Sequence, residues 1–313
     1  MPNTMPGHQD RTILDIAEQA MKDADYNTLS QCMDGLRQNL RANPYLLEPL
    51  IALADHVSKQ QEFIPHALAA YRDAARYAAS GSDLEQQAVA GFVRHADAIP
   101  DVVECINAYI NAARYAASGS DLEQQAVAGI LRHADAIPNV EERINAYSNA
   151  ARYAASGSDL EQQAVAGILR HADDISDTSL RLGAYRCAAA FAAPCSDLEQ
   201  QAVVGFVRNA DDIPDTSRRL EAYRYAASYA ASGSDLEQQA VAGFVRHADA
   251  ITNVEERIHA YRYAVYEAGR DSALWQTATA GMERRATAAT TKSGPTMPTR
   301  KNVRRFMNKV CRL

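Results

Sequence analysis

One eight-residue run, Ser-Asp-Leu-Glu-Gln-Gln-Ala-Val, constrains the fold of this 313-residue chain more than any other feature. It recurs at a constant period of 38 residues, starting at Ser82, Ser120, Ser158, Ser196 and Ser234. A fixed period of roughly 20–50 residues is the signature of a stacked repeat array. In such an array each unit contacts mainly its neighbours, and the stacked units present an extended surface. We therefore expect an array that binds something along that surface.

Each unit carries start and stop signals for two helices. In the first copy, Ser82 followed three residues later by Glu85 is a capping-box pattern. Pro100 biases the residue before it away from helical angles, so the first helix is predicted to end at about Ile99. A second helix is predicted to follow and to end just before Gly119, since glycine suits the left-handed position after many helices.

The predicted fold is all-α: an α-solenoid of tandem 38-residue helix-turn-helix repeats with right-handed superhelical stacking. Outside the five complete copies, the repeat pattern weakens and the composition changes. The predicted segments are a disordered N-terminus (1–10), an N-terminal helical cap (11–43), a degenerate repeat (44–81), five tandem repeats (82–271), a partial repeat (272–290), a flexible linker (291–299) and a basic C-terminal amphipathic tail (300–313).

The charge is unevenly distributed. The net charge of −7 disfavours non-specific nucleic-acid binding by the whole body, because phosphate neutralisation needs Lys and Arg. The C-terminal tail carries six basic residues and no acidic residue. We expect the tail to cap the array or to contact an acidic partner or an anionic surface. The tail residues proposed for this contact are Arg300, Lys301, Arg304, Arg305 and Lys309.

The cysteines and the N-terminal residues bear on the compartment. The five cysteines form no CxxC pair and do not recur at the repeat period, so a reducing compartment is favoured over a disulfide framework. The first residues lack the apolar core of a signal peptide, and no apolar run is long enough to span a membrane. A cytoplasmic protein is predicted, with non-classical secretion into a host cell left open.

Three residue types recur in columns along the array. The glycine column, which includes Gly91, is interpreted as close approach of two backbones, with a ligand against the backbone as the alternative. The tyrosine column, which includes Tyr71, is interpreted as packing between repeats, with each hydroxyl reaching water or a carbonyl; binding through the hydroxyls is the alternative.

The histidine column invites a metal site. Equivalent positions in adjacent repeats are about 10 Å apart, the spacing of packed helices. Ligand nitrogens on one Zn²⁺ ion must lie about 3–4 Å apart. We therefore expect hydrogen-bonded, partly buried histidines and no metal. The column contains His95, His133, His171 and His247.

The outward stripe of the first helix is the candidate partner-binding surface. A ladder of Arg and Gln donors would suit an extended peptide or an acidic segment. The alternative is a solvated face on which Arg and Asp pair three residues apart within one helix. The candidate residues are Gln87, Arg94, Asp97, Gln125, Arg132, Asp135, Gln163, Arg170, Asp173, Arg208 and Arg246.

The second helix differs between copies on one face. It changes from amide-rich, as at Asn107 and Asn111, to rich in Arg and Tyr, as at Arg224 and Tyr225. Tuning to a non-repetitive partner and neutral drift are the two interpretations. The chain contains no Walker motif, no GxGxxG and no local context for a Ser-His-Asp triad, so we predict no catalytic residue, no cofactor and no enzymatic activity.

The unit resembles tetratricopeptide and Sel1-like helical-hairpin repeats over residues 44–290. The tetratricopeptide Trp and Leu-Gly pair are absent, and Ile-Pro-Asp replaces the Sel1-like Gly-x-Gly turn. The resemblance implies protein–protein scaffolding on a concave face. We predict a non-catalytic scaffold that binds a protein or peptide, with action on host proteins as a bacterial effector left open; the alternative is a nucleic-acid-binding repeat protein that uses the basic tail. The residues that carry the resemblance are Ala108, Tyr109, Ala112, Ala113, Gly119, Ala126 and Gly129.

Overall fold

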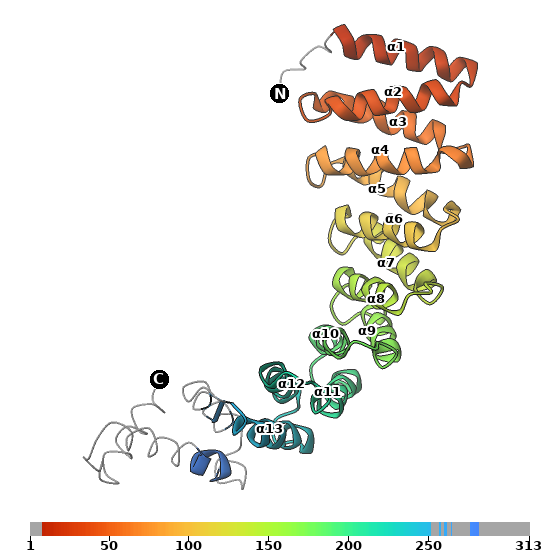
Figure 1. The fold of residues 1–313 in the computed structure, drawn as a ribbon. Helices are drawn as coiled ribbons and strands as arrows, with labels where there is room; N and C mark the ends of the chain where they lie inside the picture. Colours follow the sequence, from red (N-terminus) through yellow and green to blue (C-terminus); the bar gives the residue numbers. More distant parts are fainter. Residues whose placement is uncertain (1–7, 252–256, 258–259, 262–263, 265–275, 282–313) are drawn as a thin grey trace, which may run out of the picture. The chain divides into compact units, whose positions relative to one another are not determined.

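The computed structural model describes residues 8–251, 257, 260–261, 264 and 276–281, and the regular elements in these residues are all helices (Figure 1). The chain divides into two compact units, Met1–His171 and Ala172–Leu313. The linker and tail predicted over residues 291–313 lie outside the described residues, as do residues 1–7 and most of the predicted partial repeat.

The first unit is built from helical hairpins that follow one another along the chain. Its α-helices are α1 (His8–Asp23), α2 (Tyr26–Asn39), α3 (Leu47–Val57), α4 (Ile64–Tyr77), α5 (Asp83–His95), α6 (Val102–Tyr115), α7 (Asp121–Ala134), α8 (Val140–Tyr153) and α9 (Asp159–Ala172), whose last residue falls in the second unit. Short 3₁₀ turns are η1 (Pro44–Leu46), η2 (Gln61–Phe63) and η3 (Ala96–Ala98).

The second unit continues the same alternation of first and second helices. Its helices are α10 (Thr178–Phe191), α11 (Asp197–Ala210), α12 (Thr216–Tyr229) and α13 (Asp235–Ala248). Within this unit α11 packs against α13, both being first helices of their repeats, and α10 packs against α12, both being second helices.

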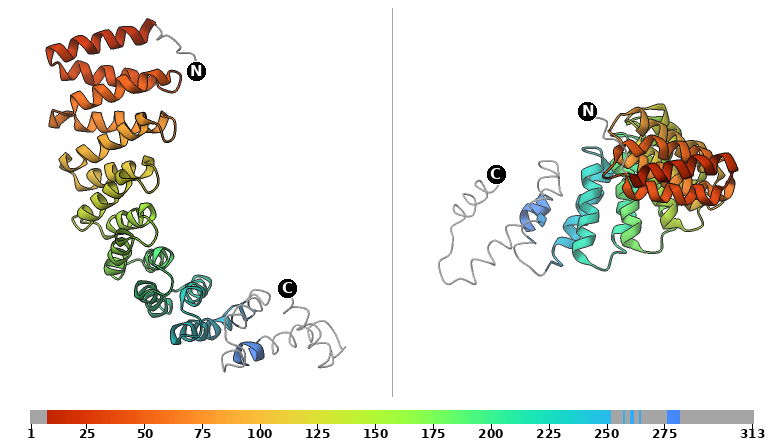
Figure 2. Two further views of the ribbon diagram at one scale, coloured as in Figure 1. Left: turned by 180° about the vertical axis from the view of Figure 1, so that it is seen from behind. Right: turned by 90° about the horizontal axis from the view of Figure 1, so that it is seen from above.

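The first unit has the same two layers. Each helix from α1 to α7 packs against the next, and in addition α5 contacts α3 and α7, while α6 contacts α4 and α8 (Figure 2). First helices therefore stack on first helices and second helices on second helices. The all-α tandem-repeat fold predicted from the period is confirmed, and the right-handed superhelical stacking stays a prediction.

The helix starts follow the predicted capping pattern. The Ser82 hydroxyl oxygen accepts a hydrogen bond from the Glu85 backbone N–H (3.3 Å), and the Glu85 carboxylate accepts one from the N–H of Gly81 (2.6 Å). The carboxylate thus reaches one residue further back than in the usual capping box. Buried Glu85 is in this way satisfied by the turn that precedes its own helix.

The helix ends differ from the prediction. Helix α5 ends at His95 and gives way to the 3₁₀ turn η3, and α6 ends at Tyr115, about three residues early. It ends there because Ala116 has extended backbone angles (ψ 148°). Gly119 does have the positive φ of 76° expected of its type, but it lies in the turn immediately before the next helix cap.

The terminal segments depart from the repeat register. Helix α1 begins at His8, inside the segment predicted to be disordered, and α1 and α2 form the hairpin predicted for the N-terminal cap. In the degenerate repeat, α3 starts without a side-chain cap, in line with its lost Ser-Asp-Leu-Glu motif. None of the helices in the described part of the chain has the length and apolar character needed to cross a membrane.

Candidate functional site

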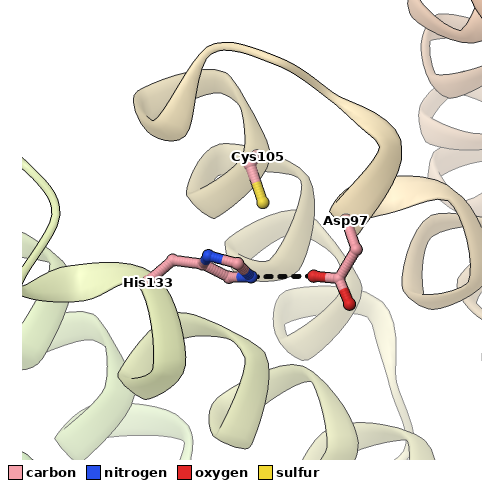
Figure 3. Close-up of side chains that lie close together, drawn as sticks. All are labelled: Asp97, Cys105 and His133. Atoms are coloured by element: carbon pink, nitrogen blue, oxygen red, sulfur yellow. Dashed lines mark hydrogen bonds and ion pairs between the residues drawn. The ribbon is translucent and has the colours of Figure 1, made fainter.

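One polar cluster recurs where consecutive repeats meet. At the first such joint, the Asp97 carboxylate accepts hydrogen bonds from the Tyr109 hydroxyl (2.7 Å) and Arg132 (2.8 Å), and it lies 2.8 Å from the His133 ring nitrogen Nε2 (Figure 3). Asp97 follows α5, Tyr109 lies on α6 of the same repeat, and Arg132 and His133 lie on α7 of the next. The aspartate therefore ties three helices together across the joint.

The same arrangement is found at the other joints in the described residues. The degenerate repeat uses Asp55, where His95 Nε2 has no hydrogen-bond partner in the described part of the chain, and Asn209 replaces the histidine at the third joint, which Asp173 forms. The corresponding sets are Asp55, Tyr71 and Arg94; Asp135, Tyr147, Arg170 and His171; Asp173, Tyr185 and Arg208; and Asp211, Tyr223, Arg246 and His247.

Each joint tyrosine lies against a glycine of the next first helix. A Cβ atom added to Gly91 would lie only 2.5 Å from the Tyr71 ring. The glycine column therefore makes room for an aromatic ring, and the predicted close approach of two backbones is wrong in this detail. The hydroxyls reach a carboxylate rather than water or a carbonyl. The other pairs are Tyr109 with Gly129, Tyr147 with Gly167, Tyr185 with Gly205, Tyr223 with Gly243 and Tyr261 with Gly281.

The hydrogen bonds of the cluster change proton affinities in opposite directions. The Tyr147 hydroxyl, then the His171 ring, lower the pKa of the Asp135 carboxyl although partial burial opposes them. Burial and the hydrogen bond to Asp135 raise the pKa of Tyr147 to about 12. Both shifts favour a neutral phenol that donates to a charged carboxylate, which is a strong type of hydrogen bond.

The structure places the predicted partner-binding stripe at these joints. Its Arg and Asp residues pair between repeats, Arg132 with Asp97 and Arg170 with Asp135, instead of three residues apart within one helix. Their side chains remain more than half exposed, at 52–59 %. The stripe glutamines Gln87, Gln125 and Gln163 are also exposed. The stripe therefore contributes ion pairs to the array, and its role toward a partner stays a prediction.

The histidine tautomer at two joints follows from an arginine beside it. Arg143 lies 3.2 Å from Nδ1 of His171, and because a guanidinium only donates, Nδ1 must accept. The proton of the neutral ring then lies on Nε2 and is donated to Asp135 (3.0 Å). Arg219 holds His247 in the same way. These rings are hydrogen-bonded and partly buried, as the sequence predicts.

The first joint differs because Cys105 stands where the later repeats have arginine. Its Sγ points toward the His133 ring and the Asp97 carboxylate (Figure 3). A Cys-His-Asp set is also the composition of a nucleophilic site, but the thiolate is the reactive form. Burial, and then the charge of Asp97, raise the pKa of the Cys105 thiol to about 11, and the residue is 2 % exposed. The arrangement therefore does not suit nucleophilic catalysis.

A groove lies on the second-helix face of the first unit, with a volume of about 240 Å³. Phe92 of α5 lies at its floor between the two second helices α4 and α6. Leu68 and exposed Arg72 come from α4, and Asn107 and Asn111 from α6. The full lining is Pro65, Leu68, Ala69, Arg72, Phe92, Ile99, Glu104, Asn107, Ala108 and Asn111.

A second groove, of about 310 Å³, lies on the second-helix face of the other unit. Every residue that lines it stands three repeat periods after a residue of the first groove, so the two are built at corresponding positions. Its lining is Ser179, Leu182, Gly183, Arg186, Phe206, Arg218, Glu221, Ala222 and Tyr225. The residue pattern indicates the variable face of the second helix but does not indicate the groove.

The polar groups of the second groove are more basic and aromatic. Arg218 and Tyr225 stand where the first groove has Glu104 and Asn111. The guanidinium of Arg186 lies 5.7 Å from the centre of the Tyr225 ring, a cation–π distance. The change from amides to Arg and Tyr along the second helices therefore falls partly on groove-lining positions.

No family model matches the chain, and no curated protein matches it. Solved structures do match. One is described as "Circular tandem repeat protein with novel repeat topology and enhanced subunit contact surfaces", 12 % identical over 88 % of this chain and 82 % of that chain, with a TM-score of 0.32. Another is described as "Computational Design of Self-Assembling Cyclic Protein Homooligomers", 17 % identical over 90 % of this chain and 92 % of that chain, with a TM-score of 0.13.

Both TM-scores are low, so the class of this protein rests on its own helices and joints. The regular hairpins and the recurring joint clusters define a helical tandem-repeat protein. Membership of the tetratricopeptide or Sel1-like families stays a prediction.

Proposed function

We propose that this protein is a non-catalytic scaffold that binds an extended peptide segment of a partner protein along its second-helix face. The observation that carries the proposal is the pair of grooves built from corresponding residues in the two units. A repeat array offers the same concave feature at successive positions, which suits an elongated ligand better than a compact one.

The groove chemistry favours a peptide in which a carboxylate stands near an apolar side chain. Phe206 and Leu182 provide an apolar floor and wall, and exposed Arg186 provides guanidinium donors at the edge. Arginine is the preferred side chain for planar recognition of a carboxylate. Arg218 adds a second cation beside the single acid Glu221, so the charge of this groove is complementary to an acidic segment.

Two observations support a binding role over catalysis or nucleic-acid recognition. The Cys105 thiol of the Cys-His-Asp set is buried, which disfavours a nucleophile. The net charge is −7, which opposes phosphate binding by the body. A tetratricopeptide-like or Sel1-like scaffold, a cytoplasmic location and an effector role toward host proteins are compatible with this proposal.

Selection of a random displayed-peptide library on the purified full chain tests the proposal. We expect the enriched peptides to combine Asp or Glu with a large apolar residue, and to bind more weakly as salt is added. Arg186→Glu should reduce the affinity of these peptides by at least about tenfold, the factor that 1.4 kcal/mol represents.

The matched control is Gln163→Glu, which introduces the same acidic side chain at an exposed position of the first-helix stripe. It should leave peptide affinity unchanged. Enrichment of peptides that bind Arg186→Glu as well as the wild type would contradict the groove assignment. Peptides lost only in Gln163→Glu would instead place binding on the first-helix stripe.

A further inference from the structure

The first joint brings together three side chains of the kinds that bind metals. Asp97, Cys105 and His133 each offer one ligand atom, and these atoms all lie within 4.8 Å of one another. They come from three parts of the chain: the 3₁₀ turn η3, helix α6 and helix α7. The Cys105 thiol is the buried member, and the Asp97 carboxylate is half exposed.

In the later repeats, an arginine occupies the position that corresponds to Cys105. There an arginine donates to the carbonyl oxygen of an isoleucine in its own repeat, for example Arg143 to Ile137 (3.0 Å). Its guanidinium also faces the histidine or asparagine of the next repeat. A fixed positive charge beside the imidazole opposes a metal cation. The arginines at this position are Arg143, Arg181, Arg219 and Arg257.

The exchange of arginine for Cys105 therefore changes the site in two ways at once. It removes the cation that faces the ring, and it adds a sulfur ligand. The remaining members of the joint are unchanged: the Tyr109 hydroxyl (2.7 Å) and Arg132 (2.8 Å) hold the Asp97 carboxylate. Hydrogen bonds of this kind to a ligating carboxylate orient it and are a regular part of metal sites.

We propose that Asp97, Cys105 and His133 bind a zinc-class divalent cation that links the first repeat to the second. Sulfur, imidazole and carboxylate are the three ligand types of protein zinc sites, and three protein ligands leave a fourth tetrahedral position for water. Zn–ligand bonds of about 2.0–2.3 Å place neighbouring ligand atoms roughly 3.3–3.8 Å apart. To reach that spacing the thiol must approach from within 4.8 Å, and the Asp97 and His133 ligand atoms, now 2.8 Å apart, must separate.

The proton balance of binding is defined. The thiol is protonated at neutral pH, so the S–H proton leaves to solvent as the sulfur–metal bond forms. The hydrogen bond between Asp97 and His133 opens at the same time, and the proton on His133 Nε2 moves to Nδ1 by exchange with solvent, so a neutral imidazole presents its Nε2 lone pair to the cation beside the Asp97 oxygen. Metal affinity should therefore rise with pH.

Cobalt titration of the purified full chain in a thiol-free reductant tests the proposal, because a thiolate bound to Co²⁺ gives a near-ultraviolet charge-transfer band. We expect a band that saturates at one equivalent and is displaced by Zn²⁺. Cys105→Arg should abolish it. This variant restores the residue that the later repeats carry, so the joint should fold, and unchanged helical circular dichroism checks that it does.

The reverse exchange is the matched gain-of-function variant. Arg143→Cys places a thiol beside Asp135 and His171, whose Nε2 lies 3.0 Å from the carboxylate. We expect the cobalt stoichiometry to rise from one to two equivalents. No band in the wild-type chain, or a band that persists in Cys105→Arg, overturns the proposal. An unchanged stoichiometry in Arg143→Cys contradicts the inference that the arginine exchange creates the site.

Discussion

At the scale of the residue, each joint depends on a tyrosine ring that packs against a glycine, where any larger residue would collide with the ring. The Tyr109 ring occupies the volume that a Cβ on Gly129 would fill, and its hydroxyl is fixed by Asp97. The ring is buried at 3 % exposure and cannot move aside without losing that hydrogen bond. Glycine is thus required there for packing, although it is a poor helix former.

We predict that Gly129→Ala destabilises the protein. Helix propensity alone would stabilise the variant by about 1 kcal/mol, but overpacking of a filled core costs roughly 1–3 kcal/mol. Gly183→Ala is the control, since an added Cβ at that helical position meets no atom within 4 Å. It should stabilise by up to about 1 kcal/mol. Urea unfolding measures both, and a Gly129→Ala protein as stable as the wild type would contradict the ring-on-glycine account.

A second residue-scale prediction concerns Cys195, which has a φ of 61° where the other repeats have glycines at 75–78°. A left-handed conformation costs a non-glycine residue about 1–2 kcal/mol, partly offset by the flexibility that glycine adds to the unfolded chain. Cys195→Gly should therefore raise stability by roughly 0.5–1 kcal/mol, seen as a higher thermal midpoint. Gly157→Ala, the reverse exchange at an equivalent turn, should lower it; equal midpoints for all three proteins would rule out strain at this turn.

At the scale of the element, the joints should be sensitive to acid. The Tyr223 hydrogen bond, helped by His247 and Arg246 against partial burial, lowers the pKa of the Asp211 carboxyl. The unfolded chain then binds this proton more tightly than the folded one. The stabilisation is present above the unfolded pKa of about 3.9 and is lost as pH falls through the lower folded value.

The expected consequence is that Asp211→Asn flattens the loss of stability below about pH 4. The exposed neighbour Asp212 provides the control, because Asp212→Asn removes a carboxylate next to the joint without removing its hydrogen bonds. Urea midpoints measured from neutral pH downward compare the two variants with the wild type. Equal acid slopes for Asp211→Asn and the wild type would show that this carboxylate does not couple the joint to pH.

The helix starts were predictable because their causes are local, whereas the joints were not. The capping contacts of Ser82 and Glu85 lie within four residues of each other. Arg132 and Asp97 are 35 residues apart, so the sequence pattern alone paired Arg94 with Asp97 in one helix. The repeat period nevertheless allows the pairing between repeats to be inferred, because two residues that recur in every repeat can contact each other between neighbouring repeats as well as within one.

The candidate sites differ in how well they can be predicted from the sequence. The spacing within the histidine column alone argues against a metal site, and Cys105 does not recur at the repeat period, so the column pattern does not connect the two. Its departure from the arginine of the later copies is the signal that would have found it. The grooves gave no such signal, because each needs Phe92 or Phe206 from one helix and walls from two others.

At the scale of the whole molecule, structure and binding use different surfaces in this account. The recurring contacts between repeats are made by the Asp, Tyr, Arg and His columns. In a repeat array the stabilisation from such contacts between neighbours adds up along the chain. The second-helix face is left to vary, and the residues that vary there, such as Asn111 and Tyr225, line the grooves. The invariant part of each unit thus builds the array, and the proposed function assigns the choice of partner to the variable part.

Hydrogen–deuterium exchange of the full chain, with and without an enriched acidic peptide, tests this division most directly. We expect slower exchange on binding in the second helices that line the grooves, α4 and α6 or α10 and α12. The stripe segments of the first helices, such as those around Gln125 and Gln163, should exchange as before. Protection confined to the first-helix stripe, with the groove helices unchanged, would contradict the account.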